Sequence, residues 1–184
     1  KNAPFIYGNA GYGEFVRTKD TYYSSAQAKE GNLIESLKVL LHENERLLQH
    51  GFTDTELERQ KLALKKEIET QYKERDRTTS ANLAMECVYH FLDNNPLFGA
   101  KKELQLVKEF LPSITLAEVN ALAKKWIITN NRALIITAPD KEGVVLPTEE
   151  DVRKVLEAYK DIETDPYKDK FLDMPLLAKT PTAG

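Results

Sequence analysis

Residues 51–57 mark the end of one helix and the start of another. Gly51 follows an apolar run with helical spacing, at the position where a left-handed residue ends a helix and a Cβ is costly. Thr53 and Glu56 have the spacing of a capping box, in which each side chain bonds the backbone of the other residue. The stretch therefore predicts two helices joined by a tight, defined turn.

The same device recurs at Thr115 and Glu118, before an apolar run that ends at Trp126. A further helix start is predicted at Thr148, where three acids follow near the positive end of the helix dipole. Apolar residues at helical spacing predict helices over residues 32–50, 54–72, 80–93, 101–111, 116–126 and 149–160. In the third of these, the phase of Cys87 predicts a small buried hydrophobe.

Two parts of the chain predict β-structure. Residues 5–18 hold three glycines among aromatic residues, residues 22–28 carry no charge, and Lys19 and Asp20 form a polar turn between them. This pattern is typical of a twisted, bulged hairpin. Residues 132–138 form a nearly continuous apolar run closed by Pro139, which predicts a buried strand. The predicted fold class is α+β, with a small antiparallel sheet packed by several α-helices.

Length and charge limit the classes of function. We expect one domain over residues 1–161 and an extended linker over residues 162–184, which contain three prolines and several acids. A net charge of −3 argues against a nucleic-acid partner. No apolar run approaches the roughly 18 residues that span a bilayer, so no membrane partner is expected. Because the chain begins at Lys1 with no signal-like region, we expect it to be cut from a longer protein.

Residues suited to catalysis are few. His42 and Glu45 share a helix face and have the spacing of two ligands of one ion, but no third ligand is indicated. Neither H-x-x-E-H nor H-E-x-x-H occurs, and the glycine-rich residues 10–14 lack the lysine of a phosphate-binding loop. We predict no catalytic residue and no metal ligand, and a self-contained metalloenzyme built on His42 is the weakest alternative.

Several strings, taken in order, resemble the M16 metallopeptidases, the group of pitrilysin, insulin-degrading enzyme and mitochondrial processing peptidase. They are residues 10–20 (AGYGEFVRTKD), 28–31 (AKEG), 51–61 (GFTDTELERQK), 110–126 (FLPSITLAEVNALAKKW), 131–139 (NRALIITAP), 147–152 (PTEEDV) and 173–177 (DMPLL). The resemblance implies the non-catalytic second domain of the first half of a long, two-halved bacterial member. In that family zinc is bound in the first domain by an inverted H-x-x-E-H motif, so zinc is expected only in the catalytic domain of the parent protein. Similar bacterial proteins are commonly exported, which leaves a periplasmic or exported parent open.

The resemblance also implies a substrate surface, because in this family the sheet of the second domain helps to wall the substrate chamber and holds peptide as an added strand. Here that surface maps onto residues 8–17 and 22–28, and the candidate substrate-binding residues are Gly11, Tyr12, Gly13, Tyr22 and Ser24. An uncharged edge strand offers unpaired amides and carbonyls to an extended peptide. The alternative is that the glycines only shape a bulge and that the strands pair internally.

The predicted function is therefore a non-catalytic part of the substrate chamber of an M16 zinc metalloendopeptidase. Its partners would be unfolded or extended peptides and the rest of the parent chain. The alternatives are a helical protein-interaction module and an inactive M16 homologue that resembles the core subunits of the family. We also expect the isolated chain to self-associate as a homodimer through its sheet, since an unpaired strand edge seeks a partner.

Overall fold

The structure, a computed structural model, describes residues 3–128, 130–139, 141, 144–160 and 162–169. The elements are β1 (Phe5–Val16), β2 (Lys19–Ala28), α1 (Leu33–His50), α2 (Asp54–Glu74), α3 (Ser80–Asp93), α4 (Gly99–Phe110), α5 (Leu116–Trp126) and α6 (Glu149–Ala158), with short 3₁₀ turns at Arg75–Arg77 and Leu111–Ser113. The α+β class is confirmed: helices dominate, and the described residues form one antiparallel sheet, in which β1 pairs with β2.

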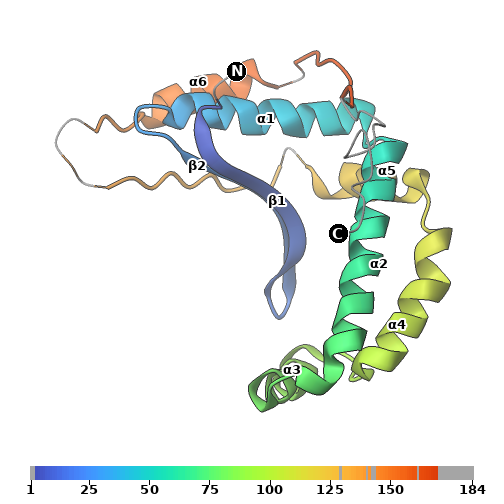
Figure 1. The fold of residues 1–184 in the computed structure, drawn as a ribbon. Helices are drawn as coiled ribbons and strands as arrows, with labels where there is room; N and C mark the ends of the chain where they lie inside the picture. Colours follow the sequence, from blue (N-terminus) through green and yellow to red (C-terminus); the bar gives the residue numbers. More distant parts are fainter. Residues whose placement is uncertain (1–2, 129, 140, 142–143, 161, 170–184) are drawn as a thin grey trace, which may run out of the picture.

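The helices form two groups that meet at the end of α1 (Figure 1). In the first group, α6 lies along α1, and the β1–β2 hairpin packs against α1 through β2. In the second group, α4 lies along α2, while α3 lies at the far end of α2 (Figure 1). The turn between α1 and α2 therefore sets how the two groups are joined.

Gly51 forms this turn with the predicted positive φ, 71°, but its ψ of −172° places it outside the left-handed helical region, in a conformation that is almost confined to glycine. Its N–H donates to the Leu47 carbonyl oxygen at 2.9 Å and closes the last turn of α1. The side chain of Asn120, on α5, then bonds both backbone groups of Phe52: its Oδ1 accepts from the N–H at 2.7 Å and its Nδ2 donates to the carbonyl at 3.3 Å. One amide side chain thus ties α5 to the α1–α2 turn.

Three helices begin with a complete capping box. The boxes at Thr53 and Thr115 are confirmed, because each threonine accepts from the N–H of the glutamate three residues later and each glutamate accepts in return. Thr148 forms the same box with Asp151 at the start of α6. Asn32 precedes α1 as expected, but its side chain makes no cap; its Nδ2 donates instead to the Glu30 carbonyl.

Two predictions about the β-structure were wrong. The hairpin turn lies at residues 17–18, so Lys19 and Asp20 belong to β2 and not to the turn. Residues 132–138 form no strand and pair with none among the described residues, and the Ile135 side chain is 84% exposed. An apolar run predicts burial only when another layer covers it, and no described layer covers this one. The predicted bulges are present, as register shifts at both ends of the hairpin.

Few apolar side chains are buried in the part of the chain that the structure describes: Ile68, Ala123 and Val155. Cys87 is exposed, so its predicted burial was wrong. The reason is that α3, which carries it, has no buried residue at all. Helical periodicity correctly predicted the helix, but it did not predict how much of the helix is buried by other elements.

Replacing Gly51 by alanine should lower the free energy of unfolding by more than 1 kcal/mol, since φ is positive and the new Cβ would lie 2.7 Å from the Asn120 side chain. Gly31 is a matched control, because its φ is 73° and no atom lies within 4 Å of an added Cβ. Gly31→Ala should therefore cost only the backbone strain. Urea unfolding of both variants measures the difference, and equal losses would show that Asn120 does not restrict the turn.

The capping boxes predict a loss of stability in acid. The hydrogen bonds from Thr115 lower the pKa of Glu118, those from Thr148 lower the pKa of Asp151, and both carboxylates are exposed. A lowered pKa stabilises the fold above the unfolded value, near 4, and this stability is lost as the pH falls through the folded value. The protection of the Thr115 N–H against hydrogen exchange, taken relative to its intrinsic rate at each pH, should therefore fall below about pH 4. Glu118→Gln keeps an acceptor without a charge and should remove this dependence; an unchanged profile would exclude the carboxylate as its source.

Candidate functional site

The five residues predicted to bind substrate all lie in the hairpin, but the strand register divides them between its two faces. Tyr12 lies opposite Tyr22, Ala10 opposite Ser24, and Gly11 opposite Tyr23. Because successive residues of a strand point to opposite faces, Tyr12, Tyr22 and Ser24 share one face, while Gly11 and Gly13 belong to the other.

The first face is fastened to α1. The Tyr22 hydroxyl donates to the Asn44 Oδ1 at 2.8 Å, and the Asn44 Nδ2 donates to the Ser24 Oγ at 3.2 Å. The Tyr22 ring is half-buried, and this burial raises the pKa of its hydroxyl. Both predicted residues therefore use their side chains to hold β2 on the helix.

The same face also contacts α5 through an aromatic pair. The rings of Tyr12 and Trp126 are stacked, with centroids 4.1 Å apart and planes 7° apart. The Tyr12 hydroxyl donates to the Asp20 Oδ2 at 2.9 Å, and this hydrogen bond to a carboxylate is the main cause of its raised pKa. Aromatic pairs of this kind contribute about 0.5–1.5 kcal/mol beyond the area that they bury. The hairpin is thus held at its base by α1 and further along by α5.

On the second face the glycines allow close approach. A Cβ on Gly11 would lie 3.0–3.1 Å from the Tyr23 side chain, so the tyrosine ring covers this position. The Tyr23 hydroxyl in turn accepts from the Asn9 Nδ2 at 3.4 Å. Gly13 is open, with no atom within 4 Å of an added Cβ. Of the five predicted residues, Gly13 therefore has the most space around it.

The outer edge of β1 is the remaining feature of the hairpin. Among the described residues β1 pairs only with β2, so the backbone groups on its other side are left without a strand. Its twelve residues include one charge, Glu14. Several large side chains along it are exposed, among them Ile6 at 69% and Phe15 at 75%. This edge is long, uncharged over most of its length and open.

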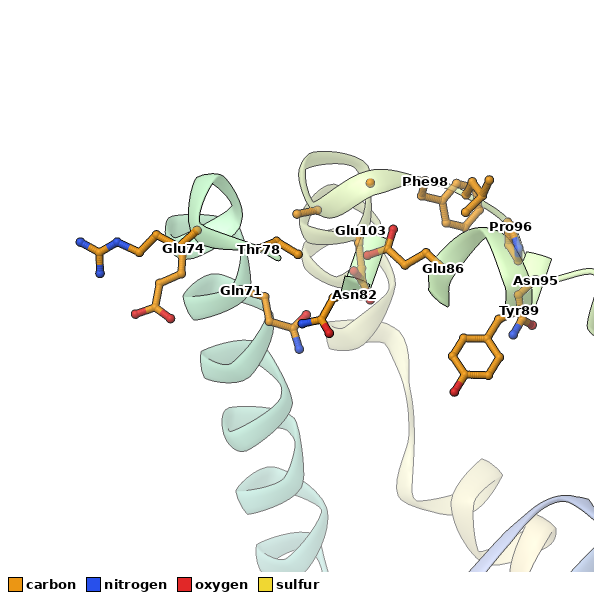
Figure 2. Close-up of a pocket in the computed structure, with 14 residues that line it drawn as sticks. Gln71, Glu74, Thr78, Asn82, Glu86, Tyr89, Asn95, Pro96, Phe98 and Glu103 are labelled. Carbon is orange, nitrogen blue, oxygen red and sulfur yellow. The ribbon is translucent and has the colours of Figure 1, made fainter. Parts of the chain in front are cut away.

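A separate hollow of about 630 Å³ lies at the far end of α2, among α2, α3 and α4 (Figure 2). Its side chains come from the end of α2, from α3 and from the start of α4, and include Gln71, Glu74, Asn82, Glu86 and Glu103. None of the predicted site residues lines it. The described residues give it no group that is buried and without a partner.

Among the described residues no group of three or more histidine, cysteine or acidic side chains is placed to hold an ion. The His42 Nδ1 lies 3.7 Å from a Glu43 carboxylate oxygen, and the His90 Nδ1 pairs with the Asn95 carbonyl at 2.6 Å.

Among the helices that the structure describes, none is both long and apolar enough to cross a bilayer.

Comparison with known proteins gives a consistent result, although no family model matches the chain. A zinc protease PQQL-like protein of Arabidopsis thaliana is 27% identical over 139 residues, which are 73% of this chain and 14% of that protein. The crystal structure of the first half of the periplasmic protease PqqL from Escherichia coli matches 90% of this chain and 36% of that one, with a TM-score of 0.67 and 16% identity. These matches support the resemblance to a segment of an M16-like zinc protease.

The whole of PqqL from Escherichia coli gives the same fold match, with a TM-score of 0.69 and 15% identity over 96% of this chain and 20% of that one. The chain therefore spans a small share of the length of each protein that it matches.

Two residues that position the hairpin were not predicted as such. Asn44 lies in the middle of α1, at a position where the spacing of Leu37, Leu41 and Leu48 calls for an apolar side chain. A polar residue at such a position is a recognisable sign of a buried hydrogen-bond partner. Trp126 was predicted as part of the helical core, and it is half-buried against Tyr12.

Trp126 is the one tryptophan of the chain, so its fluorescence reports the stacked pair. Tyr12→Ala should change the Trp126 emission and lower the free energy of unfolding by about 1 kcal/mol or more. Tyr12→Phe keeps the ring while losing the hydrogen bond to Asp20, and should leave the emission almost unchanged. Tyr7→Ala, an exposed tyrosine of the same strand, is the control. Equal emission changes for the two alanine variants would contradict the pairing.

Proposed function

We propose that this M16-like segment forms part of the wall of a peptide-holding chamber in a larger zinc peptidase and contributes no catalytic residue. The observation that carries the proposal is the open outer edge of β1, a strand of twelve residues with a single charge. Such an edge can accept an extended peptide as a further strand through main-chain hydrogen bonds.

The geometry of the hairpin supports this role. Asn44 of α1 and Trp126 of α5 both hold the inner face, so the outer edge is fixed in position before a ligand arrives. A fixed edge loses little conformational entropy on binding. Main-chain pairing is also nearly independent of the peptide sequence, which suits unfolded or extended substrates. In this proposal Gly13 leaves space beside the edge, and Tyr22 and Ser24 act by holding the strand.

The chemistry of hydrolysis would come from elsewhere in the parent protein. The described residues do not fit a zinc site, whereas the Arabidopsis relative is named a zinc protease and the Escherichia coli neighbour a periplasmic protease. We propose that zinc is held by another domain of the parent, and that the parent is exported. In the same proposal residues 1–161 belong to the second domain of the first half, and residues 162–184 to the linker that follows.

One observation favours the second candidate, a helical interaction module. The helix α3 has no buried residue, and several of its apolar side chains are exposed, including Leu83 at 51% and Phe91 at 84%. Exposed apolar patches of this kind mark interaction surfaces. The exposed Ile135 gives similar support to the proposed homodimer of the isolated chain.

Strand addition is tested with a fluorescent, uncharged peptide of about ten residues, the length of a strand. We expect it to bind the chain, and we expect a copy methylated on every second backbone nitrogen to bind about tenfold more weakly or worse. The reason is that each lost main-chain hydrogen bond costs about 1 kcal/mol. Anisotropy titration measures both affinities.

Two protein variants separate edge pairing from general apolar contact. Tyr7→Lys places a charge on the exposed side of β1, and Leu62→Lys makes the same change on exposed α2. The first should weaken peptide binding and the second should not. If both peptides bind equally well, or if the α2 variant has the larger effect, the β1 edge is not the binding site.

A further inference from the structure

Residues 162–169 follow α6 and form neither a helix nor a strand, yet they are held firmly at the end of α1. Thr164, in the middle of this extended segment, is only 7% exposed. A threonine in a solvated linker has no reason to be buried, because its hydroxyl is well satisfied by water. The surroundings of Thr164 therefore require an explanation of their own.

The Gln49 side chain contacts the segment as a neighbouring strand would. Its Nε2 donates to the Ile162 carbonyl oxygen at 2.5 Å, and its Oε1 accepts from the Thr164 N–H at 3.0 Å. In a sheet, the carbonyl of one residue and the N–H two residues later pair with the same adjacent strand. The Oε1 also accepts from the Thr164 hydroxyl at 2.8 Å, so one amide satisfies both the backbone and the side chain.

The next residue completes the main-chain contacts. The His50 Nε2 lies 2.5 Å from the Thr164 carbonyl oxygen. A carbonyl oxygen only accepts, so the Nε2 carries the hydrogen in this contact. Gln49 and His50 together therefore bond the carbonyl of Ile162 and both backbone groups of Thr164.

Two side chains further along the segment are also engaged. The Arg46 guanidinium lies over the Tyr167 ring, 5.1 Å from its centroid. The Arg59 Nη1 lies 2.6 Å from the Asp169 Oδ2. The Arg59 side chain is 42% exposed and the Asp169 side chain 17%, so solvent screens this ion pair only in part.

We infer that the end of α1 is a peptide clamp that reads the main chain of an extended segment and is occupied by this chain's own residues 162–169. Its ligand is an extended peptide with a small hydroxyl residue in the buried position, an aromatic ring three residues later and an acid two residues after that. The clamp fixes where the chain lies after α6. The clamp is independent of the β1 edge, so the two proposals can be tested separately.

Hydrogen exchange of the Thr164 amide in the full chain tests the clamp. Gln49→Ala removes the acceptor of this amide, and we expect its exchange to become about tenfold faster, as the loss of roughly 1.4 kcal/mol would give. Trypsin should also cleave faster after Lys168, an exposed residue of the segment. The matched control is Gln71→Ala, which changes an exposed glutamine of α2 whose Nε2 donates to the Glu67 Oε1 at 3.3 Å.

The variants at Thr164 define the contact further. Thr164→Val keeps the shape but loses the hydroxyl, so it should weaken the clamp, whereas Thr164→Ser should keep it. If Gln49→Ala prevents folding, Gln49→Glu serves instead, because it retains an acceptor for Thr164 but offers no donor to Ile162. The inference would be overturned if a folded Gln49 variant showed the same exchange rate at Thr164 and the same rate of tryptic cleavage as the unsubstituted chain. Peptide binding at β1 should be unchanged in every case.

Discussion

The contact between Gly51 and Asn120 is the constraint on which the rest of the structure depends. Gly51 ends α1 with a positive φ that other residues rarely adopt, and the missing Cβ leaves space for the Asn120 amide to bond both backbone groups of Phe52. The two helix groups meet at this turn, and the residues just before it hold the segment 162–169. Few apolar side chains are buried among the described residues, so polar contacts of this kind help to set how the helices are oriented relative to one another.

Much of the helical framework could be predicted because its signals are local. A capping box requires two residues three positions apart, and the boxes at Thr53 and Thr115 were recognised from that spacing alone. The strand predicted over residues 132–138 failed for the opposite reason, since burial depends on partners distant in sequence. The same applies to Cys87, because its helix was correctly predicted but the exposure of its side chain was not.

The hairpin was predicted from the sequence, but the contacts of its side chains were not. Glycines and uncharged residues identified the hairpin, because these residue types constrain a strand locally. The roles of Tyr22 and Ser24 depend on Asn44, a residue that no local motif connects to them. Gln49 and Thr164 are 115 positions apart, and nothing in either local sequence indicates that they meet. Single polar contacts between distant residues leave no periodic pattern to detect.

The contact between Gln49 and residues 162–169 has a consequence for how order is recognised in a chain. Secondary structure is defined by repeating backbone patterns, and a segment that lacks them is recorded as irregular. Yet one amide side chain supplies the donor and the acceptor that an adjacent strand would supply, and Thr164 is buried as a result. The segment therefore has a defined path and direction without belonging to any sheet. A backbone without regular secondary structure can thus still have defined hydrogen-bond partners.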